Sequence, residues 1–100
     1  MNGVIMNDKP INIKVRIEGF SETKFIHVKL KEGSCLTDLL SQLIAIYGGE
    51  IEPYLYDSIT GELAVYSVII NSKLYRLKEE SYQELFDNDS VFFISPLGGG

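Results

Sequence analysis

At residues 32–34 the sequence changes its hydrophobic period from two to about 3.6 residues, and this change limits the folds that the chain can adopt. Over residues 11–18 and 26–31, apolar residues alternate with polar ones, which predicts two half-buried strands. The turn Gly19–Thr23 joins them as an antiparallel hairpin. Over residues 36–47, leucines and isoleucines recur on one stripe, which predicts an amphipathic helix. We therefore expect one face of the hairpin and one side of the helix to be buried.

The ends of the predicted helix carry recognisable signals. Ser34 or Cys35 lies in the N-cap region, where serine is the better chemical cap, and Asp38 lies in the first turn, where a negative charge is favourable. Gly48 and Gly49 supply the left-handed residue that commonly ends a helix.

After the helix the signals are shorter, and residues 50–63 are ambiguous. Residues 64–70 predict a strand in which Val68 and Ile70 face inward, whereas Val65 faces the opposite side. The other expected elements are a short strand over residues 54–56, turns over 58–61 and 71–73, a short strand over 74–77, a short helical turn over 81–86 and a last strand over 90–94.

This order of elements predicts an α+β fold, a mixed sheet with one main helix packed across it. The β-grasp (ubiquitin-like) arrangement accommodates it, with the first and last strands parallel and adjacent in the middle of the sheet. We expect the β-grasp domain over residues 11–97, a mobile lead-in over 1–10 and a flexible glycine tail over 98–100.

The end of the sequence is the candidate functional segment. Val91–Ile94 is strand-like, Pro96 ends the strand, and three glycines follow. Glycine loses more backbone freedom on ordering than any other residue, so Gly98–Gly100 cannot add to the core. A thin arm of this kind can enter a narrow channel and place its terminal carboxylate against a reactive centre of another protein.

The segment Leu85–Val91, followed by Phe92–Leu97 and a diglycine end, resembles the C-terminal signature of the ubiquitin-like sulfur carriers. This family includes the small subunit of molybdopterin synthase (MoaD), the thiamin sulfur carrier ThiS and the ubiquitin-related modifiers. Asn88 stands where the family's Asp-Gly-Asp turn has glycine, and asparagine is the next best residue at a left-handed turn position. The likeness covers residues 11–100 and is greatest to the MoaD group.

The resemblance implies chemistry at the terminus. An α-carboxyl group has a pKa of about 3.5, so it is ionised and a poor electrophile at neutral pH. In the family it is adenylated by an enzyme of the ubiquitin-activating type, which uses ATP, and then becomes a thiocarboxylate that donates sulfur. The resemblance thus assigns the reaction to Gly100, with Gly99 beside it, and adds the large subunit of a molybdopterin synthase as a possible partner. No cofactor is expected on this chain itself.

Alternation from Val91 and Phe93 places Phe92 and Ile94 on the face away from the helix. There they either form a docking patch for a partner or are covered by residues 50–63. The expected partner-binding residues are Phe92, Ile94, Pro96, Leu97 and Gly98.

Composition excludes several classes of partner. Fourteen acidic and nine basic residues give a net charge of −5, which argues against nucleic acid and anionic membranes. Cys35 is alone, so it forms no internal disulfide or cysteine metal cage, which suits a reducing cytoplasm.

Residues 1–10 do not resemble a signal peptide, and no stretch is as long as a membrane span. We expect a cytoplasmic protein.

Nothing in the spacing of His27 and Cys35 pairs them as base and nucleophile, so the chain alone is not expected to be an enzyme. Asp87 and Asp89 are expected to be turn residues that bond the local backbone. Three functions stay open: a sulfur carrier, a protein modifier joined through Gly100 to lysine amines, and a β-grasp interaction domain with an inert tail. The sequence does not separate the molybdopterin, thiamin and tRNA-thiolation pathways.

Overall fold

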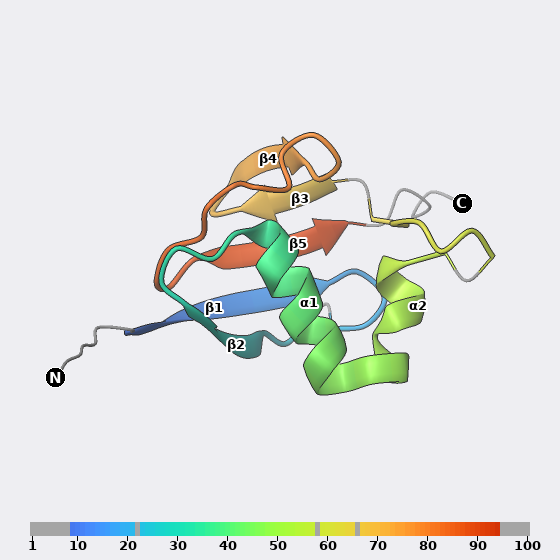
Figure 1. Ribbon diagram of the computed structural model, residues 1–100, viewed down its shortest axis with the longest axis horizontal. Helices are drawn as coiled ribbons and strands as arrows, with labels where there is room; N and C mark the ends of the chain where they lie inside the picture. Colours follow the sequence, from blue (N-terminus) through green and yellow to red (C-terminus); the bar gives the residue numbers. More distant parts are fainter. Residues whose placement is uncertain (1–8, 22, 58, 66, 95–100) are drawn as a thin grey trace, which may run out of the picture.

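The computed structural model describes residues 9–21, 23–57, 59–65 and 67–94. Its elements are β1 (Pro10–Ile17), β2 (Ile26–Lys31), α1 (Leu36–Tyr47), the 3-10 turn η1 (Gly48–Glu50), α2 (Glu52–Leu55), β3 (Ser67–Ile70), β4 (Lys73–Arg76) and β5 (Ser90–Ile94). The strands form one five-stranded sheet in the order β2-β1-β5-β3-β4, and α1 crosses one face of it (Figure 1). Within this part of the chain no helix combines the length and the apolar character needed to cross a bilayer.

The sheet has the predicted β-grasp connectivity. β1 and β5 are parallel neighbours in the middle of the sheet, whereas β1–β2, β3–β4 and β3–β5 are antiparallel. Residues 1–8 of the predicted lead-in (1–10) and the whole predicted tail (98–100) lie outside the described residues. β1 begins at Pro10, one residue earlier than expected.

The core lies between the sheet and α1, and the predicted periods explain it. Alternate residues of β1, β2 and β5 are buried, and so is one stripe of α1. Burying an aliphatic or aromatic side chain of this size stabilises the fold by about 1.5–3 kcal/mol. The fully buried members of these four elements are Ile13, Val15, Ile17, Val28, Leu36, Leu39, Leu43, Val91 and Phe93.

The start of α1 follows the prediction for Asp38 and decides between the two cap residues. Cys35, not Ser34, is the N-cap, and its backbone N–H donates a hydrogen bond of 2.8 Å to Asp38 Oδ2. Gly48, with φ +55°, ends the helix as predicted.

The predicted helical turn over residues 81–86 is wrong, and the start of α1 explains why. The first N–H groups of a helix have no partner within it. Those of Leu36 and Thr37 donate to the carbonyl oxygens of Gln83 and Ser81, at 3.1 and 3.2 Å. The chain therefore makes only a turn at residues 81 and 82, closed by the Gln83 N–H and the Glu80 oxygen at 3.0 Å, and Glu84 then forms a β-bridge with Cys35.

The predicted strand over residues 54–56 is also wrong. Residues 52–55 form α2, in which Pro53 occupies the first turn, where its missing N–H costs no hydrogen bond. The predicted turn over 58–61 is confirmed for its described residues. Asp57 Oδ1 accepts the Ile59 N–H at 2.7 Å, and Gly61 has φ +75°.

β3 begins at Ser67, three residues later than predicted, although Val68 and Ile70 are buried as expected. Val65 does not face outward: it is buried, because the chain before β3 bonds to α2 instead of the sheet, through the Ala64 N–H and the Leu55 oxygen at 2.7 Å. The next turn, at Asn71 and Ser72, has positive φ at both residues (+50° and +89°), as a two-residue type I′ hairpin requires.

Candidate functional site

β5 is the strand that leads to the glycine end of the sequence. It pairs with β1 on one side and β3 on the other, and Phe93 within it is fully buried. Residues 95–100 therefore follow a strand that is fixed by hydrogen bonds to both neighbouring strands and by the burial of Phe93 in the core. The predicted site residues Pro96, Leu97, Gly98, Gly99 and Gly100 lie outside the described residues, and their roles stay predictions.

The turn that starts β5 is fixed by its two aspartates. Asn88 has φ +71°, so asparagine does occupy the left-handed position of this turn. Asp89 bonds the local backbone as predicted, because its Oδ2 accepts the Phe86 N–H at 2.8 Å. Asp87 reaches further: its Oδ1 accepts the backbone N–H of Asn12 on β1, at 2.7 Å. The turn thus sets where β5 begins along β1.

On the sheet face opposite the core, which we call the outer face, three apolar residues of neighbouring strands line up. Phe92 of β5 pairs with Ile69 of β3, and Ile69 pairs with Leu74 of β4. Leu74 is 61% exposed, and the other two are partly exposed. We call these three residues the docking row. The predicted orientation of Phe92 and Ile94, away from the core, agrees with this arrangement.

Arg16 of β1 continues the docking row on its other side. Its guanidinium carbon lies 4.4 Å from the ring centroid of Phe92 and 5.3 Å from that of Phe25. These three residues and Ile69 of the docking row line a hollow of about 490 Å³. The segment expected as an alternative cover for Phe92 is placed elsewhere, since Ile51 and Leu55 are buried in the core.

The outer face also differs from the rest of the molecule in charge. None of the five strands contains an aspartate or glutamate, although the chain has 14 of them. The strand register places five basic side chains on the outer face, so this face is positive in a chain whose net charge is −5. They are Lys14, Arg16, Lys29, Lys31 and Arg76.

The structure does not bring the single histidine and the single cysteine together. His27 is exposed on β2 and pairs with Lys14, whereas Cys35 is partly buried before α1 and is bridged to Glu84. In the described residues, no group of three or more histidine, cysteine, aspartate or glutamate side chains could hold a metal ion.

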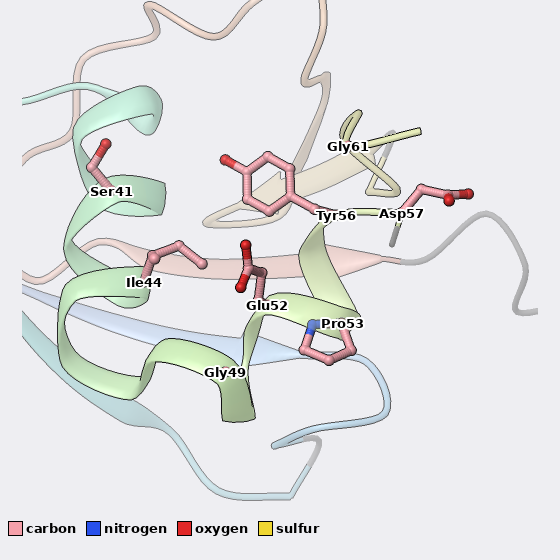
Figure 2. A pocket seen from close by; sticks show the side chains of 8 residues that line it. All are labelled: Ser41, Ile44, Gly49, Glu52, Pro53, Tyr56, Asp57 and Gly61. Carbon is pink, nitrogen blue, oxygen red and sulfur yellow. The ribbon is translucent and has the colours of Figure 1, made fainter. Parts of the chain in front are cut away.

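A hollow of about 740 Å³ lies on the helix side, between α1 and α2 (Figure 2). The Tyr56 ring and the Glu52 carboxylate point into it beside Ile44, and the Asp57 carboxylate points away from them. The sequence did not predict it, because the wall opposite α1 comes mainly from residues 50–63, which showed no period. Pro53 directly after a possible helix start was the one signal that could have indicated α2.

Comparisons with known proteins give the fold and one relative. No family model matches the sequence. An uncharacterized protein of Archaeoglobus fulgidus is 32% identical over 79 residues, which are 79% of this chain and 80% of that protein. The solution structure of the Haloferax volcanii HVO 2177 protein covers 97% of this chain and 94% of its own, with TM-score 0.63 and 22% identity.

A second solution structure, of the small archaeal modifier protein 1 (SAMP1) from Methanosarcina acetivorans, covers 92% of this chain and 99% of its own. Its TM-score is 0.61 and its identity is 18%. At these identities the two structures establish the fold, whereas the relative establishes the family. The chain belongs to the same family as the Archaeoglobus fulgidus protein, and its fold is the ubiquitin-like β-grasp.

Proposed function

We propose that this chain is a ubiquitin-like sulfur carrier of the cytoplasm whose Gly100 carboxylate is activated by a partner enzyme. The observation that supports this most is the position of β5, a central strand that leads directly to the Gly98–Gly100 sequence. A strand paired on both sides fixes the position at which the following segment begins. A partner protein that must bind this segment in one defined position requires this.

The proposed reaction has two steps. The carboxylate of Gly100 attacks the α-phosphate of ATP, which yields an acyl-adenylate and pyrophosphate. A hydrosulfide then attacks the acyl carbon and expels AMP, which leaves a thiocarboxylate. ATP is bound by the adenylating enzyme, and the chain itself supplies only the carboxylate and the narrow arm. The small-subunit role in a molybdopterin synthase-like complex is the form of this proposal that the sequence resemblance favours.

The docking row is the proposed contact with the adenylating enzyme. Phe92 and Leu74 offer apolar surface next to the strand that leads to the tail, and interface cores are made of such residues surrounded by polar ones. Arg16 beside Phe92 adds a planar cation, the side chain most often found with aromatic residues at energetically important contacts.

The test combines the full chain, ATP and the ubiquitin-activating-type enzyme encoded in the same genome. Pyrophosphate release and an intact-mass gain of one adenylyl group (AMP less one water) should appear. Addition of hydrosulfide should then release AMP and leave a chain in which one carboxylate oxygen is replaced by sulfur. A variant that lacks Gly99 and Gly100 should retain the circular dichroism spectrum of the folded protein. It should show neither adenylation nor incorporation of sulfur. Adenylation of that truncated variant at the normal rate would overturn the proposal.

The protein modifier is the second candidate, favoured by the structural likeness to a protein whose name describes it as a modifier. It shares the adenylate, but a lysine amine then attacks and forms an amide with Gly100. Cell extract supplied with ATP separates the two. Conjugates that carry Gly100 on substrate lysines support the modifier, and a thiocarboxylate without conjugates supports the carrier. A third candidate, an interaction domain with an inert tail, predicts neither product.

A further inference from the structure

β2 is an edge strand of the sheet, and on its free side no strand pairs with it in the described part of the chain (Figure 1). The outward N–H and C=O groups of an edge strand can accept an extended segment of another protein as a further strand. β2 runs for six residues, Ile26–Lys31, which is long enough for such pairing.

A groove follows this edge. A hollow of about 480 Å³ lies between β2 and α1, and one of its walls is made by three consecutive residues of the edge, Lys29, Leu30 and Lys31. The facing wall comes from α1, with Ser41 and Gln42 among its residues. A strand added to β2 would therefore have space for side chains on the helix side.

The charges of the edge select the added segment. The three outer-face residues of β2, His27, Lys29 and Lys31, are all exposed, and no strand contributes a carboxylate to balance them. Successive residues of a strand point to opposite faces, so every second residue of an added strand would lie beside these side chains. Acidic residues are favoured at those positions.

The groove side favours uncharged residues. Leu30 lines it with an apolar side chain, and the hydroxyl of Ser41 and the amide of Gln42 are neutral. Asp38 is the only carboxylate among the residues that line this hollow, and its Oδ2 already accepts the Cys35 N–H at the positive end of α1. Its charge is therefore partly balanced within the fold and does not make the groove a site for cations.

We propose that β2 binds an extended segment of a partner protein as a sixth strand, with acidic residues over Lys29 and Lys31 and uncharged residues in the groove. The other edge strand, β4, fits such a segment less well. It has four residues, and its outer-face side chains are Leu74 and Arg76, only one of them basic. This site is separate from the docking row and does not depend on the chemistry proposed for Gly100.

The experiment uses the full chain and a blocked synthetic heptapeptide of sequence EVDVEVD. Amide shift changes in NMR spectra should centre on residues 26–31 and on Ser41 and Gln42. Replacing Lys29→Glu and Lys31→Glu together should weaken binding at least about tenfold, because two attractive contacts become repulsive. The matched control, Lys73→Glu with Arg76→Glu, changes net charge equally at the other edge and should alter the affinity less than about twofold in 0.15 M salt.

Two further peptides distinguish strand addition from charge attraction alone. They have the same sequence, with backbone N-methyl groups either on the valines or on the acidic residues. One of the two sets of N–H groups faces β2 in an added strand, so one of these peptides should lose binding and the other should retain it. Undiminished binding of both peptides, equal losses in the two charge-reversal variants, shifts centred away from β2, or no binding at millimolar peptide would each overturn the proposal.

Discussion

The side-chain amide of Asn71 donates a hydrogen bond of 2.7 Å to the carboxylate of Asp89, 18 residues further along the chain. Asn71 Oδ1 also accepts the Ser90 N–H at 2.9 Å. One side chain thus joins the β3–β4 turn to the first residue of β5. Asp89 is nearly buried and is bonded at both oxygens, since its Oδ2 accepts the Phe86 N–H. The base of the candidate site is therefore held by the hairpin beside it.

Replacing Asn71→Ala should destabilise the protein by about 2–3 kcal/mol, measured by urea unfolding. The change removes two hydrogen bonds, one of them to a charged and nearly buried carboxylate. It also places alanine at φ +50°, a left-handed conformation that alanine adopts less readily than asparagine. Ser72→Gly in the same turn is the control. It should stabilise by about 0.5–1 kcal/mol, because glycine adopts φ +89° without strain. Losses of the same size in both variants would contradict the role given to Asn71.

Replacing Gly19→Ala should cost about 1–2 kcal/mol. Gly19 has φ +89°, and a Cβ there would lie 3.3 Å from the ring of Tyr54, which is tighter than an ordinary contact. Gly49→Ala is the matched change, because Gly49 has no positive φ and a Cβ there meets nothing within 4 Å. Thermal unfolding should show Gly49→Ala to be neutral or slightly stabilising. A larger loss for Gly49→Ala than for Gly19→Ala would refute this account.

Replacing Phe92→Ser and Ile94→Ser together should weaken binding of the adenylating enzyme by a few kcal/mol, the size of an interface hot spot. Stability should fall much less than for Phe93→Ala, which truncates a fully buried side chain and should cost about 3–5 kcal/mol. Calorimetric titration and chemical unfolding of the same samples give both numbers. Unchanged binding of the double variant would remove the docking row from the proposed function.

Replacing Gly99→Val should leave folding and partner affinity nearly unchanged and severely reduce adenylation or sulfur transfer. Valine widens the arm and restricts its backbone, and displacement of a reacting group by about 1 Å can cost on the order of 100-fold in rate. Single-turnover transfer and equilibrium binding are to be measured on the same variant. Transfer at the unmodified rate would contradict the argument that the glycine arm must pass through a narrow channel.

The parts of the fold that the sequence predicted are those set by local periods. The alternation from Ile11 to Ile17 and the stripe of α1 were confirmed, because each follows from which residues one element must bury. Residues 81–86 were assigned wrongly, because their conformation is fixed by hydrogen bonds to Leu36 and Thr37, far away in the chain. Such bonds leave no pattern in the segment itself.

The same reasoning applies to the candidate site. Alternation within β5 gave the orientation of Phe92 and Ile94, which the structure repeats. The docking row also needs the pairing of Phe92 with Ile69 and of Ile69 with Leu74, and strand register between distant segments cannot be read from either strand alone. The glycine predictions rest on the sequence and await the experiments above.

The parallel pairing of β1 with β5 has a consequence for synthesis on the ribosome. β1 is made first, but its neighbour in the sheet is the last strand to be made, and β5 also separates β1 from β3. The nascent chain therefore lacks the middle of its sheet until residues 90–94 have left the exit tunnel, since contacts between distant segments must wait for both partners. A chain that stops before β5 thus holds two separate antiparallel pairs, β1–β2 and β3–β4, and lacks the strand that joins them into one sheet.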